Sequence, residues 1–221
     1  MSQRFIHVLL TLCILMGGPA FAVDLSGPAR VVDGDTIEVA GQRVRLLDID
    51  AFESGQYCQD AKGRRQHCGK FAELQLVSLV GQNPVRCTGT EFDRYNRLLA
   101  RCAVAGADLG EAMVASGMAL TFDGSGPYTA AEARARRTGQ GFWAGTFEHP
   151  RAFRAARWQA GAQVSPEGCP IKGNISRKGD RIYHTPYSRH YARTRINLAN
   201  GERWFCSERE ALDAGWRAPL R

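Results

Sequence analysis

An even number of cysteines after residue 22 constrains this chain most, because six thiols can close three covalent loops. An even count in an exported chain is typical of disulfides. We expect nearest neighbours to pair, although other connectivities remain open, which gives Cys58–Cys68, Cys87–Cys102 and Cys169–Cys206. Cys87 and Cys102 fall on consecutive strand-like runs, where a cross-strand bridge is geometrically reasonable. The alternative is a zinc site from Cys169, His184, His190 and Cys206, whose spacing matches no common zinc pattern.

The first 22 residues are typical of a secretory signal. Arg4 precedes an apolar stretch over residues 8–16, and Ala20-Phe21-Ala22 is a small-residue cleavage site. The apolar stretch is shorter than the roughly 20 residues that a membrane span needs. We therefore expect cleavage after Ala22 and a periplasmic or secreted protein, with an uncleaved anchor as the alternative.

Positive charge is concentrated near the C-terminal end. Residues 23–162 contain 17 Lys/Arg and 16 Asp/Glu, whereas residues 163–221 contain 11 and 6. The composition of residues 161–168 is linker-like, so we expect one domain over residues 23–162 and a small basic domain over residues 163–221. Basic charge attracts polyanions such as nucleic acid or the cell envelope. A solvated face that only aids solubility is the alternative, and we expect no protein partner.

The periodicity of apolar residues predicts strands interleaved with helices. Strands are expected over residues 29–40 (broken at Asp33-Gly34), 43–50, 85–92, 98–104 and 118–122. Helices are expected over residues 69–81, 109–117 and 128–137. In the tail, residues 182–184 and 194–196 are strand candidates and residues 208–215 a helix. The result is an α+β fold, which a five-stranded OB-type barrel with helices packed outside would satisfy.

Three stretches carry residues suited to phosphodiester hydrolysis, which needs a positioned water, a base and positive charge on the phosphoryl oxygens. They are Asp33-Gly34-Asp35-Thr36, Arg45-Leu46-Leu47-Asp48-Ile49-Asp50-Ala51-Phe52-Glu53 and Asp93-Arg94-Tyr95-Asn96-Arg97. Carboxylates and carbonyls suit a hard cation such as calcium, and arginines suit a phosphate. Since side chains alternate along a strand, Arg45 and Asp50 can reach one site only if the chain bends near Asp48.

Together, in this order, the three stretches resemble the thermonuclease family, whose founding member is staphylococcal nuclease. The resemblance covers about residues 28–145, with further support from residues 109–114 and 139–143. It implies an OB-type barrel in which Asp35, Asp50 and the backbone carbonyl of Ala51 bind Ca²⁺. It also implies that Glu53 orients or deprotonates water, and that Arg45 and Arg97 stabilise the transition-state charge.

Further residues follow from the same resemblance. Arg94 and Tyr95 match the part of the family motif that contacts the nucleotide. Where the family has proline and glycine, this chain has Phe52 and Asn96. Phe52 either leaves its loop looser or packs against a base, and Asn96 tolerates the positive φ that the turn needs. Phe122 and Tyr128 are the candidates for aromatic stacking on the nucleotide.

The sequence thus predicts an exported calcium-dependent nuclease that acts on DNA and/or RNA and leaves 3′-phosphate ends. The alternative is an OB-type protein that binds nucleic acid without cleaving it. The basic tail is expected to contact polyanions or the envelope.

Overall fold

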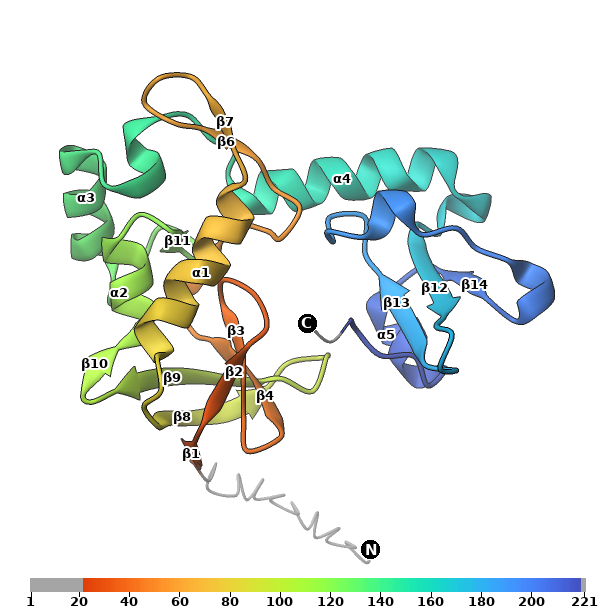
Figure 1. Ribbon diagram of the computed structural model, residues 1–221, viewed down its shortest axis with the longest axis horizontal. Coiled ribbons are helices and arrows are strands. Elements are labelled where there is room, and N and C mark those ends of the chain that lie inside the picture. The colour runs from red at the N-terminus through yellow and green to blue at the C-terminus, as the bar shows by residue number, and fades with distance from the viewer. Residues whose placement is uncertain (1–21, 220–221) are drawn as a thin grey trace, which may run out of the picture.

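Two separate hydrophobic cores organise residues 22–219, the part of the chain that this computed structural model describes. The larger core lies in residues 23–147, and the smaller one lies after residue 157. A long helix, α4 (Pro150–Val164), runs from one to the other (Figure 1). Among residues 22–219 no helix is long and apolar enough to cross a membrane. The predicted signal peptide lies, except for Ala22, outside the described residues.

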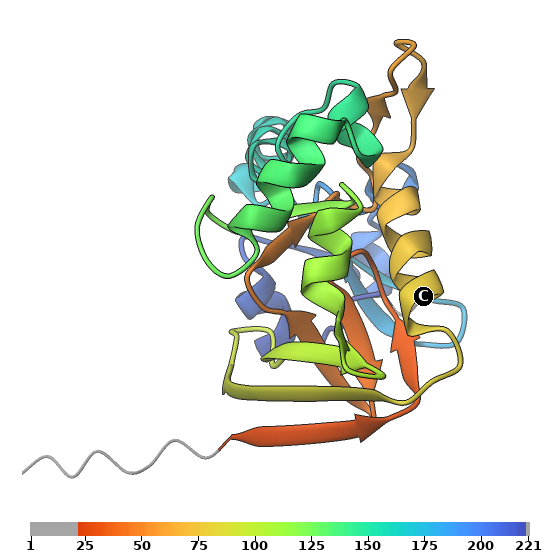
Figure 2. The same cartoon turned by 90° about the vertical axis from the view of Figure 1, so that its left-hand side faces the viewer.

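The larger unit is built on a curled sheet that forms a half-barrel (Figure 2). The strand order is β1-β8-β9-β4-β3-β2, and β10 pairs with β9. Only β4 and β9 run parallel among these pairs. The strands are β1 (Val23–Gly27), β2 (Ala29–Val31), β3 (Thr36–Val39), β4 (Gln42–Leu46), β8 (Val85–Phe92), β9 (Leu98–Val104) and β10 (Ala107–Asp108). Alternation sets the buried face, since Leu98, Ala100, Cys102 and Val104 of β9 all point into the core.

Two further strand pairs complete this unit. Strand β5 (Ile49–Ala51) pairs with β11 (Ala119–Thr121), and β6 (Cys58–Gln59) with β7 (Arg65–Gln66). The prediction of an α+β fold with an OB-type barrel is confirmed. Four short elements, β1, β6, β7 and β10, were not predicted, because runs of two to five residues carry little periodicity.

Helices α1 (Cys68–Val80), α2 (Leu109–Ala115) and α3 (Thr129–Thr138) form the other side of the larger core. Helix α1 buries Cys68, Ala72, Leu76 and Val80, which recur every four residues and so share one face. Helix α2 begins at Asp108, whose carboxylate accepts a hydrogen bond from the backbone N–H of Glu111. The three predicted helices are all present, within two residues at each end.

The smaller unit is a three-stranded antiparallel sheet with one short helix. Its strands, in the order β13-β12-β14, are β12 (Ile171–Ile175), β13 (Arg181–His184) and β14 (Arg203–Phe205), and its helix is α5 (Glu208–Asp213). Its buried core contains only Ile171, Tyr183, Phe205, Ala211 and Trp216. The predictions of a strand at 182–184 and a helix near 208–215 are confirmed.

Two predictions about the tail are wrong. Residues 194–196 form no strand, because the segment follows a 3-10 turn and Lys172 Nζ donates to the carbonyls of Tyr191 and Thr194 at 3.0 and 2.9 Å. The segment 161–168 is not a flexible linker, since α4 continues to Val164. Gly161 is buried there, and a Cβ atom at this position would come within 3.0 Å of Pro170 and Pro186. This glycine permits close packing within the smaller unit.

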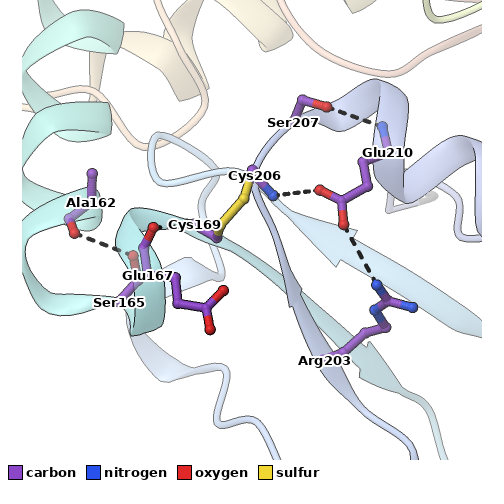
Figure 3. Close-up of a disulfide and its surroundings, with 8 residues drawn as sticks. All are labelled: Ala162, Ser165, Glu167, Cys169, Arg203, Cys206, Ser207 and Glu210. Atoms are coloured by element: carbon purple, nitrogen blue, oxygen red, sulfur yellow. Dashed lines mark hydrogen bonds and ion pairs between the residues drawn. A yellow bond between two sulfur atoms is a disulfide. The ribbon is translucent and has the colours of Figure 1, made fainter.

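All three predicted disulfide pairings are confirmed. Cys87 and Cys102 lie directly opposite each other on β8 and β9. The Cys169–Cys206 bond ties the segment before β12 to the end of β14 (Figure 3). Because both thiols are bonded to each other, the zinc alternative is wrong. The ring of His184 instead pairs with Asn174, with Nε2 2.9 Å from Oδ1.

The small core of the C-terminal unit makes its stability depend on its disulfide. Replacing both Cys169 and Cys206 by serine should destabilise this unit by about 3 to 4 kcal/mol, the entropy of opening a loop of this length in the unfolded chain. Urea unfolding followed by tryptophan fluorescence would measure the change, since Trp204 and Trp216 belong to this unit. An unfolding transition that stays at the wild-type position would contradict the prediction.

Candidate active site

The first two motif stretches meet because β3 and β4 are paired strands. Thr36 lies opposite Arg45 in their register, and the backbone N–H of Leu46 donates to the carbonyl of Asp35 at 2.8 Å. Arg45 Nη1 lies 2.7 Å from Asp35 Oδ2, and Nη2 lies 3.5 Å from Asp50 Oδ1. One guanidinium group therefore bridges the two carboxylates that the sequence assigned to the metal.

A bend brings Asp50 to this side, as the alternation of side chains required. Strand β4 ends at Leu46, Asp48 has a φ of 66°, and β5 starts at Ile49. Arg101 holds the bend by donating two hydrogen bonds to Asp48 Oδ2, at 2.6 and 3.2 Å. The bend turns Asp50 inward, where its side chain is 1% exposed.

The loop that carries Glu53 is held by a buried glutamine and by the packing of Phe52. Buried Gln56 accepts a hydrogen bond from the N–H of Glu53 at 3.1 Å and donates to the carbonyl of Glu148 at 2.6 Å. Phe52 is 2% exposed and packs edge-on against Phe142 and Phe147. Phe52 is thus part of the core, so the suggestion that it packs against a base is wrong.

The third stretch is a tight turn organised by Asp93. Its carboxylate accepts hydrogen bonds from the backbone N–H groups of Tyr95 and Arg97 and from Arg97 Nε, and forms an ion pair with Arg97 Nη2 at 2.7 Å. Asn96 has a φ of 58°, the left-handed conformation expected of it. Arg94 donates to the hydroxyl of Tyr95 at 2.6 Å. The turn thereby holds the guanidinium of Arg97 in one orientation.

The three stretches line one cavity of about 550 Å³. The predicted site residues on its wall are Asp35, Arg45, Ala51, Glu53, Arg94, Tyr95 and Arg97. Asp50 does not line the cavity, but it forms ion pairs with Arg45 and Arg154, which do. Phe122 also lines the cavity, whereas Tyr128 is buried with its hydroxyl on the carboxylate of Asp108. Of the two aromatic candidates, only Phe122 can contact a ligand there.

The charges in the cavity shift one another's protonation. Burial disfavours the charged form of Asp35, but Arg45 and then Arg97 outweigh it and lower the pKa of this carboxyl. Burial raises the pKa of Glu53 to about 7, although Arg154 opposes the shift. Burial would lower the pKa of Arg97, but Asp35 and Asp93 more than compensate and raise it. Asp35 therefore remains a carboxylate at neutral pH, as a cation ligand must.

One residue at the centre of the site was not assigned to it from the sequence. Arg154 of α4 donates to both carboxylate oxygens of Asp50, at 2.8 and 3.1 Å, and to Glu53 Oε1 at 2.7 Å. In the sequence, Arg151, Arg154 and Arg157 are spaced three residues apart. Nothing in that spacing distinguishes the one arginine that points into the site.

The C-terminal unit supplies a second wall of the cavity. Glu208 accepts hydrogen bonds from the hydroxyls of Tyr183 and Tyr187, at 3.0 and 2.8 Å, and all three residues line the cavity. Arg43 of β4 donates to the carbonyl of Pro219 at 3.3 Å. The cavity therefore lies between the two units and is completed by both.

The expected metal ligands are few but chemically suitable. Within residues 22–219 no group of three or more His, Cys, Asp and Glu side chains could hold a metal ion. The expected set has only two carboxylates and one backbone carbonyl. All of these donors are oxygens, which a hard cation such as Ca²⁺ prefers, and Asp35 and Asp50 are already close enough to share one guanidinium.

The turn that carries Arg97 allows a direct test of its backbone strain. Replacing Asn96 by alanine should cost about 1 kcal/mol of folding free energy, because alanine lacks the short polar side chain that lets asparagine tolerate positive φ. Replacing it by glycine should cost less, since glycine adopts this conformation freely. Urea unfolding of the two variants measures the difference, and equal losses would contradict it.

Comparison with known proteins agrees with this geometry. The family model described as staphylococcal nuclease homologue matches residues 43–145, and a model described as ArfC matches residues 152–218. The chain is 36% identical to the succinoglycan biosynthesis protein ExoI of Rhizobium meliloti (strain 1021), over 71% of this chain and 84% of that protein.

Two further relatives are named as nucleases. The chain is 34% identical to micrococcal nuclease of Shigella flexneri, over 66% of this chain and 86% of that protein. It is 31% identical to an uncharacterized endonuclease of Escherichia coli O157:H7, over 55% of this chain and 74% of that protein. This chain therefore belongs to the thermonuclease family, the homologues of staphylococcal nuclease.

Proposed function

We propose that this protein is an exported calcium-dependent nuclease that hydrolyses phosphodiester bonds of DNA and/or RNA and leaves 3′-phosphate ends. The observation that carries the proposal is the meeting of all three motif stretches at one cavity, within a chain of the thermonuclease family. Carboxylates and guanidinium groups converge there from β3–β4, from β5 and its following loop, and from the turn at residues 93–97.

Asp35, Asp50 and the backbone carbonyl of Ala51 would hold Ca²⁺. When bound, the ion would supply positive charge to a phosphoryl oxygen. The support for this ligand set is the closeness of two buried carboxylates that face a common cation, Arg45. A buried carboxylate pair that already shares a positive charge is suited to a divalent cation, because the cation offsets the repulsion between the two carboxylates.

Glu53 is the proposed group that orients or deprotonates the attacking water. Glu53 lines the cavity. The side chain of Gln56 accepts a hydrogen bond from the backbone N–H of Glu53, which fixes the backbone position from which the carboxylate extends. Arg45 and Arg97 would stabilise the charge that develops on the phosphoryl oxygens during in-line attack. A guanidinium keeps its charge and offers paired donors, which suits both residues to this role.

Arg94 and Tyr95 are the proposed contacts to the nucleotide, and Phe122 the proposed stacking surface. Phe122 is 45% exposed at the cavity wall, with Arg151 over its ring at 5.9 Å. An exposed aromatic ring beside arginines is a surface on which a base can stack. We further propose that the basic C-terminal unit, residues 163–221, contacts polyanions or the cell envelope.

Three disulfides support an oxidising location. We propose that the mature protein begins after Ala22 and is periplasmic or secreted. We also propose the domain division expected from the sequence, residues 23–162 and 163–221. Helix α4, Pro150–Val164, crosses the proposed boundary.

The decisive test is degradation of plasmid DNA by residues 23–221, with calcium or with a calcium chelator. Glu53→Gln should reduce the rate about 100-fold or more, the usual contribution of a general base. Chelation should abolish cleavage by the wild-type protein. Glu91→Gln, which removes an exposed carboxylate on β8, is the matched control and should cleave at the wild-type rate.

Near-wild-type cleavage by Glu53→Gln would overturn the assignment of the base. A salt-sensitive mobility shift with no cleavage under any condition would identify a binding protein. One observation favours that alternative: Arg154 occupies side-chain oxygens of both Asp50 and Glu53.

A further inference from the structure

The contacts of Arg154 link the C-terminal part of the chain to the carboxylates of the site. Both of its Nη atoms reach Asp50, and Nη1 also reaches Glu53. Arg154 lies outside the match to the staphylococcal nuclease homologues and inside the second match, which begins at residue 152. Arg154 thus comes from a different part of the chain than Arg45, the other arginine that contacts Asp50.

The helix that carries Arg154 is anchored at both ends. Near its start, Pro150 and Phe153 are buried. Towards its end, Trp158 packs against the smaller core and Gly161 lies against Pro170 and Pro186. Figure 1 shows α4 spanning the distance between the two units. The packing of α4 therefore sets the position of the Arg154 backbone, from which the guanidinium reaches the carboxylates.

The guanidinium and a divalent cation need the same atoms. Asp50 is 1% exposed, and both of its oxygens accept from Arg154. Arg45 forms ion pairs with Asp35 and Asp50, and Arg154 forms ion pairs with Asp50 and Glu53. A dication that bound the oxygens of Asp50 without displacing Arg154 would bring a second positive group onto the same buried carboxylate, and the two like charges would repel each other.

We propose that Arg154 is a positioning residue that competes with the metal ion for Asp50, so that Ca²⁺ binding requires Arg154 to leave this carboxylate. The inference rests on the proposed calcium site. In the absence of the ion, the hydrogen bonds from Arg154 hold the side chains of Asp50 and Glu53 in place. If Asp50 held Ca²⁺, the guanidinium of Arg154 would be free to move into the cavity, on whose wall Arg154 lies.

Competition of this kind is reciprocal. If Arg154 weakens Ca²⁺ binding, then Ca²⁺ must weaken the contact between α4 and the site by the same factor. Metal binding would thereby loosen the C-terminal wall of the cavity, which includes Tyr187 and Glu208. The C-terminal unit would act as a part of the nuclease site that responds to the metal.

Calcium titration calorimetry of residues 23–221 measures the first half of this linkage. Arg154→Ala should bind Ca²⁺ more tightly than wild type, by about 5- to 150-fold, the range typical of coupled sites. Arg154→Lys, which keeps the charge but offers no fork of donors, should lie in between. Arg151→Ala removes the same charge one turn earlier, where the side chain faces Phe122, and should leave the affinity near wild type.

Hydrogen exchange of α4 measures the second half. Saturating Ca²⁺ should speed exchange in α4 of the wild-type protein and have little effect on the already released Arg154→Ala helix. Equal or weaker Ca²⁺ affinity in Arg154→Ala would overturn the inference, as would equal tightening in Arg151→Ala, because long-range charge alone would then explain the effect. If no variant binds Ca²⁺, the proposed calcium site itself fails.

Discussion

Burial of three carboxylates is the constraint on which this site depends. A buried carboxylate is stable only with a cationic or hydrogen-bonding partner, and Asp35, Asp50 and Glu53 are brought together where water is largely excluded. Guanidinium groups from three different elements offset the negative charge of these carboxylates. Arg45 comes from strand β4, Arg97 from the turn after β8, and Arg154 from α4, the helix that runs between the two units. The ion pairs of these arginines therefore help to hold the sheet, the turn and α4 together.

This arrangement makes the C-terminal unit more than an appended domain. Tyr183, Tyr187 and Glu208 of this unit form one wall of the cavity, and Arg154 of α4 also lies on the cavity wall. A module that only bound nucleic acid away from the cavity would not need to face the carboxylates of the site.

Local chemistry made much of the larger unit predictable. Alternating apolar residues in β8 and β9 and the four-residue spacing in α1 each match one period, so the elements were found with their boundaries close to those observed. The tail was predicted less well because its order comes from tertiary contacts. Gly161 resembles a linker residue until Pro170 and Pro186 are seen against it, and residues 194–196 are fixed by a lysine more than 20 positions earlier.

The sequence by itself indicated the family, the α+β fold, a favoured disulfide pairing and the site residues of the three motif stretches, because those signals are local or lie in a fixed order along the chain. It also required the bend at Asp48, since alternation along a strand forbids Arg45 and Asp50 on one face without it. Only the tertiary structure decided which arginine of α4 reaches the carboxylates and that the C-terminal unit closes the cavity. Both depend on how α4 packs between two cores, and residue spacing alone does not encode the rotation of a helix about its axis relative to a distant sheet.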